Sequence, residues 1–261
     1  MTDGPRTFRQ ALATVSDLVA AKAGRTVTVC IPARNEARTI ATVVRTVLGS
    51  HGPAPGSGLV DEVLVVDDGS TDDTAGRSRA AGARVLSLSG PGGKGRAMAA
   101  GLEKATGDLL VYLDGDVENT SEVFVSGLVG PLLLFDDVTL VKGFYDRPFG
   151  DDPQGGGRVT ELVARPVIEL LFPELTAVRQ PLAGETAAHR WVLEKVEFAS
   201  DYGVELGLLV DVARRFGART IAQVDLGVRI HRNRPLSELR PQATQVLRAA
   251  LDRTGIGPDG S

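Results

Sequence analysis

The sequence contains one cysteine, Cys30, and only three histidines in 261 residues. A single cysteine excludes an intrachain disulfide framework and a cysteine cluster for zinc, and three histidines leave few nitrogen ligands for any metal. No apolar run approaches the roughly 20 residues that span a bilayer. The N-terminus lacks a basic segment followed by an apolar core, so we expect no secretory signal and a cytoplasmic protein.

The composition favours a globular enzyme over a nucleic-acid-binding or disordered chain. The net charge is −4 and the pI about 5.5, which argues against a generally basic nucleic-acid binder. Hydrophobic residues make up 43% and charged residues 24%, too ordinary a balance for a mostly disordered chain. The 31 glycines and 14 prolines indicate many loops, where binding residues often lie.

Short apolar segments alternate with helical patterns through the first half of the chain. Strands are expected at residues 27–31, 63–66, 84–87, 109–113 and 138–144. Helices are expected after Asn35 and Ser70, both predicted N-caps, and over residues 94–105. Such alternation predicts an α/β fold with a mostly parallel central sheet flanked by helices.

The second half has a more helical pattern. Helices are expected at residues 159–171, with an interruption near Pro166, at 204–216 and at 236–251, and a strand at 220–230. We therefore divide the chain into a peripheral N-terminal helix (1–25), an α/β part (26–145) and a helical C-terminal part of the same domain (146–261).

Polar residues follow three of the predicted strands. They are Asn35 and Glu36, Asp67 and Asp68, and Asp114 and Asp116. Ligands of open α/β sheets bind outside the carboxyl ends of the strands, so these residues indicate a site. In Asp114-Gly115-Asp116, two carboxylates beside a glycine suit a divalent cation next to a diphosphate.

Two glycine-rich loops and one histidine add candidate anion and metal contacts. Lys94 follows Gly92-Gly93, but the nucleotide-triphosphatase pattern is absent because Leu88 stands where it needs glycine. Gly157 and Arg158 precede a predicted helix, whose N-terminal N–H groups bind anions. His231 stands among three arginines and an asparagine after a strand, where it can act as a metal ligand.

In combination, these motifs resemble the GT-A glycosyltransferases, which use nucleotide-diphosphate sugars. The motifs are residues 31–36, residues 66–74 and Asp114-Gly115-Asp116. In the second half, residues 155–166, 180–182, 202–205 and 231–236 resemble the glucosyl-3-phosphoglycerate synthase family. That family implies a GT-A fold, Mg²⁺ or Mn²⁺, and retaining transfer of glucose from UDP-glucose to 3-phosphoglycerate, a small acidic acceptor. We also expect a homodimer.

The resemblance implies a role for each matching position. It makes residues 26–145 the nucleotide-sugar-binding part and residues 146–261 the acceptor-binding part. Donor contacts fall on Pro32, Ala33, Arg34, Glu36, Asp68, Lys94 and Asp114. Acceptor contacts fall on Gly157, Arg158, Thr160, Tyr202 and Asn233. Metal contacts fall on Asp116 and His231, and the catalytic residues are Glu205 and Asp116.

Other functions fit parts of the pattern. Arg34, Asp68 and Gly115 depart from the family pattern, which allows another nucleotide sugar or another acidic acceptor. A nucleotidyltransferase also joins an α/β sheet to a metal and a phosphate. A binding regulator without activity is disfavoured by Asp114, Asp116 and His231. A polyprenyl-phosphate transferase is disfavoured because no apolar segment suits membrane docking.

Overall fold

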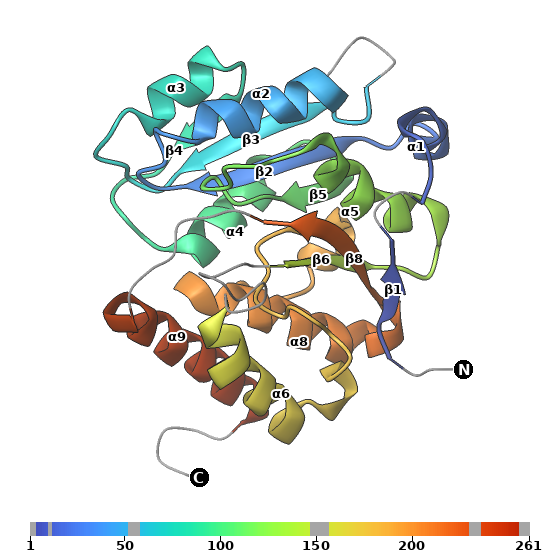
Figure 1. Ribbon diagram of the computed structural model, residues 1–261, viewed down its shortest axis with the longest axis vertical. Helices are drawn as coiled ribbons and strands as arrows, with labels where there is room; N and C mark the ends of the chain where they lie inside the picture. The colour runs from blue at the N-terminus through green and yellow to red at the C-terminus, as the bar shows by residue number, and fades with distance from the viewer. Residues whose placement is uncertain (1–3, 10–11, 52–57, 147–156, 230–235, 256–261) are drawn as a thin grey trace.

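One eight-stranded sheet runs through the described residues, with helices on both faces (Figure 1). The computed structural model describes residues 4–9, 12–51, 58–146, 157–229 and 236–255. The strands are β1 (Arg6–Phe8), β2 (Val27–Ala33), β3 (Glu62–Asp67), β4 (Arg84–Ser87), β5 (Leu109–Tyr112), β6 (Leu140–Asp146), β7 (Thr186–His189) and β8 (Ile221–Val228). The helices are α1 (Val15–Lys22), α2 (Ile40–His51), α3 (Thr74–Ala80), α4 (Lys94–Lys104), α5 (Glu122–Leu134), α6 (Arg165–Leu171), α7 (Arg190–Leu193), α8 (Val204–Phe216) and α9 (Leu236–Thr254).

The strand order is β1-β8-β6-β7-β5-β2-β3-β4. Among the described strands, only β7 runs antiparallel to its neighbours, β5 and β6, and every other described pair is parallel. The predicted α/β fold with a mostly parallel sheet is therefore confirmed. Because β2 pairs with both β3 and β5, the carboxyl ends of these three strands meet at one edge of the sheet.

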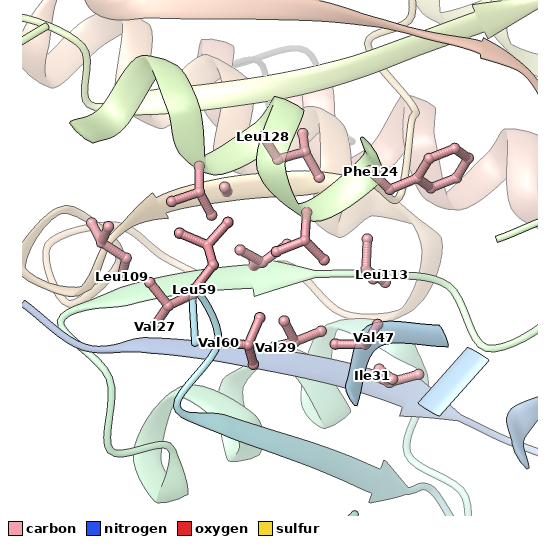
Figure 2. Close-up of a cluster of buried hydrophobic side chains, with 14 of the residues drawn as sticks. Val27, Val29, Ile31, Val47, Leu59, Val60, Leu109, Leu113, Phe124 and Leu128 are labelled. Atoms are coloured by element: carbon pink, nitrogen blue, oxygen red, sulfur yellow. The ribbon is translucent and has the colours of Figure 1, made fainter. Parts of the chain in front are cut away.

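The alternation of side chains along β2 divides the core between the two faces of the sheet. Val27, Val29 and Ile31 point to the face covered by α2 and α5, where they join a cluster that includes Phe124 (Figure 2). Cys30 points to the opposite face, beneath α4. A Cβ on Gly101 of α4 would lie 2.3 Å from Cys30 Sγ, so this glycine lets the helix approach the sheet.

The C-terminal helices cover the face of the sheet that carries Cys30. Buried residues of α4, α6, α8 and α9 form one apolar cluster there. The interruption predicted near Pro166 is a π-helical turn, Thr160–Ala164, directly before α6. No helix within the described ranges is long and apolar enough to cross a bilayer.

The prediction of N-caps at Asn35 and Ser70 is wrong. Helix α2 begins at Ile40 and α3 at Thr74. Asn35 has φ 58°, and its side-chain oxygen accepts the N–H of Thr71 at 2.8 Å. Ser70 Oγ accepts the N–H of Asn35 at 2.9 Å. The two residues thus join the loops after β2 and β3 instead of capping helices.

Several elements of the fold are not evident from the sequence pattern. Residues 1–25 were expected to form a peripheral helix, but Arg6–Phe8 form strand β1, which extends the sheet by pairing with β8. Helix α1 covers only Val15–Lys22. Helix α5 and strand β7 were not predicted. Since β7 lies between β5 and β6, the two halves of the chain share one sheet.

Candidate active site

A cavity of about 580 Å³ opens where β2, β3 and β5 end. Its walls are the residues that follow these strands, the loop before α4 and the turn before α8. The lining residues are Pro32, Ala33, Arg34, Asn35, Glu36, Asp68, Pro91, Gly92, Gly93, Lys94, Ala97, Asp114, Gly115, Asp116, Asp201 and Tyr202. Every residue that the sequence analysis assigned to the donor lies among them.

Asp68 anchors the glycine-rich wall of this cavity. It is 4% exposed, and its carboxylate accepts the N–H groups of Gly92 at 3.0 Å and Gly93 at 2.8 Å. The neighbouring Gly69 has φ 69°, and a Cβ there would lie 2.7 Å from the carbonyl carbon of Gly90. The loop after β3 therefore fixes the loop before α4 by close backbone contact.

Lys94, the first residue of α4, pairs with two carboxylates through one ammonium group. Its Nζ lies 2.5 Å from Asp114 Oδ1 and 2.6 Å from Glu205 Oε1. Burial by itself lowers the pKa of Lys94, but the carboxylates of Asp114 and Glu205 raise it above its ordinary value. Lys94 thus stays charged and ties the end of β5 to the start of α8.

Arg229 pairs with both carboxylates after β5. Its Nη2 donates to Asp114 Oδ2 at 2.8 Å and to Asp116 Oδ1 at 3.0 Å. Burial by itself raises the pKa of Asp114, but Lys94 and Arg229 hold it well below its ordinary range. The Asp114 carboxylate is therefore ionised and fixed from two sides.

The donor set at Asp116 suits a hard divalent cation. Its side chain is 30% exposed and faces the cavity beside Gly115. Mg²⁺ usually takes one or two protein carboxylates and completes its shell with diphosphate oxygens and water. The described residues hold no group of three or more His, Cys, Asp or Glu side chains placed for a metal. His231, the other predicted metal contact, lies outside the described residues.

Glu205 lies behind Lys94. Its side chain is 6% exposed, and the described residues that line the cavity do not include it. Its position in the first turn of α8 is electrostatically favourable for a carboxylate. The pairing with Lys94 gives Glu205 a specific partner beyond this general effect.

The predicted acceptor residues are only partly brought together. Tyr202 lines the cavity, whereas Gly157, Arg158 and Thr160 are not among its described lining residues. Gly157 has φ 80° directly before the helical segment, and Thr160 is 6% exposed. Asn233 lies outside the described residues.

The sequence analysis missed two residues of the site. Asp201 lines the cavity with φ 52° and accepts a hydrogen bond from Gln245 Nε2 at 3.1 Å. Arg229 entered the sequence analysis only as a flank of His231. In the structure its guanidinium is 3% exposed, and such a buried charge needs acidic partners, but the sequence around Arg229 contains no signal that these partners lie after β5.

Comparison with known proteins assigns the family. Residues 28–172 match the family described as Glycosyl transferase family 2. The glucosyl-3-phosphoglycerate synthase of Mycolicibacterium smegmatis is 50% identical over 258 residues, which cover 95% of this chain and 84% of the relative. The chain belongs to the glucosyl-3-phosphoglycerate synthase family. The synthase of Petrotoga mobilis is 41% identical over 241 residues, with 87% of this chain and 73% of the relative covered.

Solved structures of this synthase family confirm the GT-A fold. The Mycobacterium tuberculosis synthase in complex with Mn²⁺, UDP-glucose and phosphoglyceric acid has a TM-score of 0.89 and 47% identity. The match covers 98% of this chain and 89% of that chain. The same synthase in complex with Mg²⁺ and UDP also has a TM-score of 0.89, with 46% identity and the same coverage. Membership of the synthase family favours glycosyl transfer over nucleotidyl transfer.

Proposed function

We propose that this protein transfers glucose from UDP-glucose to 3-phosphoglycerate, with retention of configuration, to give glucosyl-3-phosphoglycerate. The observation that carries this proposal is the cavity at the ends of β2, β3 and β5, which gathers every residue predicted to contact the donor. Relatives that are about 50% identical to this chain in sequence are named for this activity. A solved structure of one such relative contains UDP-glucose and phosphoglyceric acid.

In this proposal, Pro32, Ala33, Arg34 and Glu36 receive the uridine, and the loop held by Asp68 borders the diphosphate. Backbone N–H groups at the start of α4 provide an anion-binding end for the phosphates. Lys94 adds the buried positive charge next to Asp114. Each residue would thereby hold the donor in one orientation, which lowers the entropy cost of the reaction.

Asp116 is the proposed metal ligand, together with His231. When bound, a divalent cation supplies positive charge that stabilises the diphosphate leaving group. The Asp116 carboxylate is the more exposed, 30% against 19%, and it pairs with Arg229, whereas Asp114 is held by both Lys94 and Arg229. We therefore assign metal binding to Asp116 and the shaping of the site to Asp114.

The acceptor is proposed to bind beside Gly157 and Arg158. A backbone N–H and a guanidinium at the start of a helical segment suit a phosphate or a carboxylate. Thr160, Tyr202 and Asn233 complete the proposed acceptor site. In the reaction, the bond between glucose C1 and the diphosphate breaks, and C1 bonds to the acceptor 2-hydroxyl oxygen. The hydroxyl proton passes to the departing diphosphate.

Glu205 is proposed to help orient the reacting sugar through Lys94 and not to act as a nucleophile. Its carboxylate pairs with the Lys94 ammonium at 2.6 Å and is almost fully buried. A carboxylate that forms a covalent glycosyl intermediate must reach C1 from the cavity. Glu205 acts instead by fixing the position and charge of Lys94.

The test is an assay with UDP-glucose, 3-phosphoglycerate and Mg²⁺ that follows both UDP release and product mass. We expect both substrates to be consumed together. In this assay Asp116→Ala should lose most activity. Asp136→Ala is its matched control and should keep activity, because Asp136 is an exposed acid outside the cavity. Release of UDP without a glucosylated phosphoglycerate would overturn the proposal.

A second candidate is transfer from another nucleotide sugar or to another acidic acceptor. Arg34, one of the departures from the expected family pattern, lines the cavity and places an additional cation at the proposed uridine end. The same assay, run with other nucleotide sugars and small phosphorylated acids, distinguishes the two candidates. A higher kcat/KM for another pair would favour the second.

We also propose that the protein forms a homodimer. Leu162 and Leu170 are 72% and 80% exposed within the helical segment that leads into and forms α6. Exposed leucines on one segment suit a self-complementary contact about a twofold axis. Light scattering on the purified protein should give twice the chain mass, and a monomeric mass at micromolar concentration would contradict this.

A further inference from the structure

Segment 183–186, which leads into β7, lies directly against Asp114. A Cβ on Gly184 would lie 2.2 Å from Asp114 Oδ1, so the backbone of the segment touches the carboxylate. Any side chain at this position would displace one of the two carboxylates that follow β5. The segment is thus the surface on which Asp114 rests.

Two residues of β6 hold this segment in place. The Lys142 ammonium donates to the carbonyl of Ala183 and, at 2.9 Å, to Thr186 Oγ1. The N–H of Gly143 donates to the carbonyl of Glu185 at 2.8 Å. Burial lowers the pKa of Lys142 to about 8. These hydrogen bonds hold the backbone on both sides of Glu185, independently of the contacts that the Glu185 side chain makes.

The Glu185 carboxylate is fully buried and anchors Arg229. It lies 3.1 Å from Arg229 Nη1 and accepts the Tyr145 hydroxyl at 2.8 Å. Arg229 Nη1 also donates to the Tyr145 hydroxyl at 2.6 Å. The other end of the guanidinium, Nη2, is the group that pairs with Asp114 and Asp116.

We propose that Glu185 is a positioning residue for the nucleotide-sugar site: it holds Arg229, and Arg229 holds the carboxylates of Asp114 and Asp116 at a fixed spacing. Glu185 itself is outside the cavity lining formed by the described residues. The proposal rests on the proposed function in taking Asp116 as a ligand of the divalent cation.

Because Glu185 and the two aspartates share Arg229, the direction of the expected change in metal affinity can be derived. One guanidinium serves Glu185 on one side and two aspartates on the other. When Glu185 is made neutral, the positive charge of Arg229 is left to Asp114 and Asp116 alone. Arg229 then competes more strongly with a cation for Asp116, and it repels that cation more. Metal affinity should fall, whereas the metal-independent part of nucleotide binding should remain.

The experiment measures Mn²⁺ binding to Glu185→Gln at saturating UDP, by electron paramagnetic resonance of free Mn²⁺. Residues that support a metal ligand typically change metal affinity by 10- to 100-fold, so we expect about a tenfold weaker affinity. Calorimetric titration of UDP without metal should give an affinity within about twofold of wild type, because Glu185 is not among the described residues that line the cavity.

Tyr145→Phe is the second variant, because it removes only one hydroxyl from the same network. It should weaken Mn²⁺ binding in the same direction but less. Thr139→Val is the matched control: it removes a buried hydroxyl, 2.8 Å from Thr220 Oγ1, near the opposite end of β6 from Tyr145. Its Mn²⁺ affinity should equal that of wild type.

Unchanged Mn²⁺ affinity in folded Glu185→Gln would overturn the proposal. If Glu185→Gln does not fold, unchanged affinity in Tyr145→Phe would overturn it, and so would an equal weakening in Thr139→Val. The probes are Mn²⁺ and UDP alone. A wild-type protein that binds both but does not glucosylate 3-phosphoglycerate would therefore refute the proposed function without affecting this test.

Discussion

Replacement of Lys94 by methionine tests the charge arrangement of the site most severely. Methionine retains the apolar stem but leaves Asp114 and Glu205, whose side chains are 19% and 6% exposed, without the shared ammonium. Removal of one partner of a buried ion pair costs about 3–5 kcal/mol of folding free energy. Asp114 keeps Arg229 at 2.8 Å, so we expect the lower end of this range, about 3 kcal/mol at pH 8.

The size of the loss should depend on pH. In the wild type, the pKa of Asp114 is lowered, so its contribution is present above the unfolded pKa and is lost only as the pH falls through the folded pKa. The pKa of Lys94 is raised, so its contribution is fully present below its unfolded pKa. In Lys94→Met, Arg229 alone remains to lower the pKa of Asp114, so this carboxyl takes up a proton at a higher pH than in the wild type, which relieves part of the penalty at low pH.

The assay is urea unfolding at pH 8 and pH 5, followed by the fluorescence of the single tryptophan, Trp191. Lys104→Met is the control, because Lys104 is 51% exposed and pairs with exposed Glu103, a contact worth at most about 1 kcal/mol. We expect Lys94→Met to lose about 3 kcal/mol at pH 8 and less than that at pH 5. A loss equal to that of Lys104→Met, or one independent of pH, would refute the reasoning.

Three further predictions concern single roles in the site. Asp116→Ala should lose most activity and its metal dependence, while the apo protein keeps nearly the same thermal midpoint; full activity in metal-free buffer would contradict the metal assignment. Arg158→Ala should raise KM for 3-phosphoglycerate much more than KM for UDP-glucose, with only partial rescue by lysine; equal increases would refute the acceptor assignment. Glu205→Gln should retain part of the turnover, because the amide still accepts a hydrogen bond from Lys94; an inactive variant together with a glucosyl adduct on wild-type Glu205 would identify a nucleophile.

The parallel half of the fold was predictable because its strands are continuous apolar runs followed by polar residues. Strand β2, for example, is buried on both faces and is apolar at every position except Thr28. Strand β7 has the sequence Thr-Ala-Ala-His, which contains no strong apolar run. It also runs antiparallel, so it does not belong to the alternation of strands and helices that predicts parallel strands. Helix α5 is apolar almost throughout, which hides its helical period.

The donor side of the site was predictable for the same reason. Residues such as Asp68, Lys94 and Asp114 follow or face strand ends, and parallel strands bring their carboxyl ends together. The network of Tyr145, Glu185 and Arg229 was not predictable, because it depends on β6 lying between β7 and β8. That order follows from tertiary packing, and no local spacing in the sequence encodes it.

We propose that the protein, at the cavity where β2, β3 and β5 end, transfers glucose from UDP-glucose to 3-phosphoglycerate with retention. The most direct test is to isolate the product formed by the wild-type protein with Mg²⁺ and to determine its linkage and anomeric configuration by nuclear magnetic resonance. We expect an α-glucosyl group on the 2-hydroxyl oxygen of 3-phosphoglycerate. A β-anomer, another linkage, or free glucose as the only product would contradict the account.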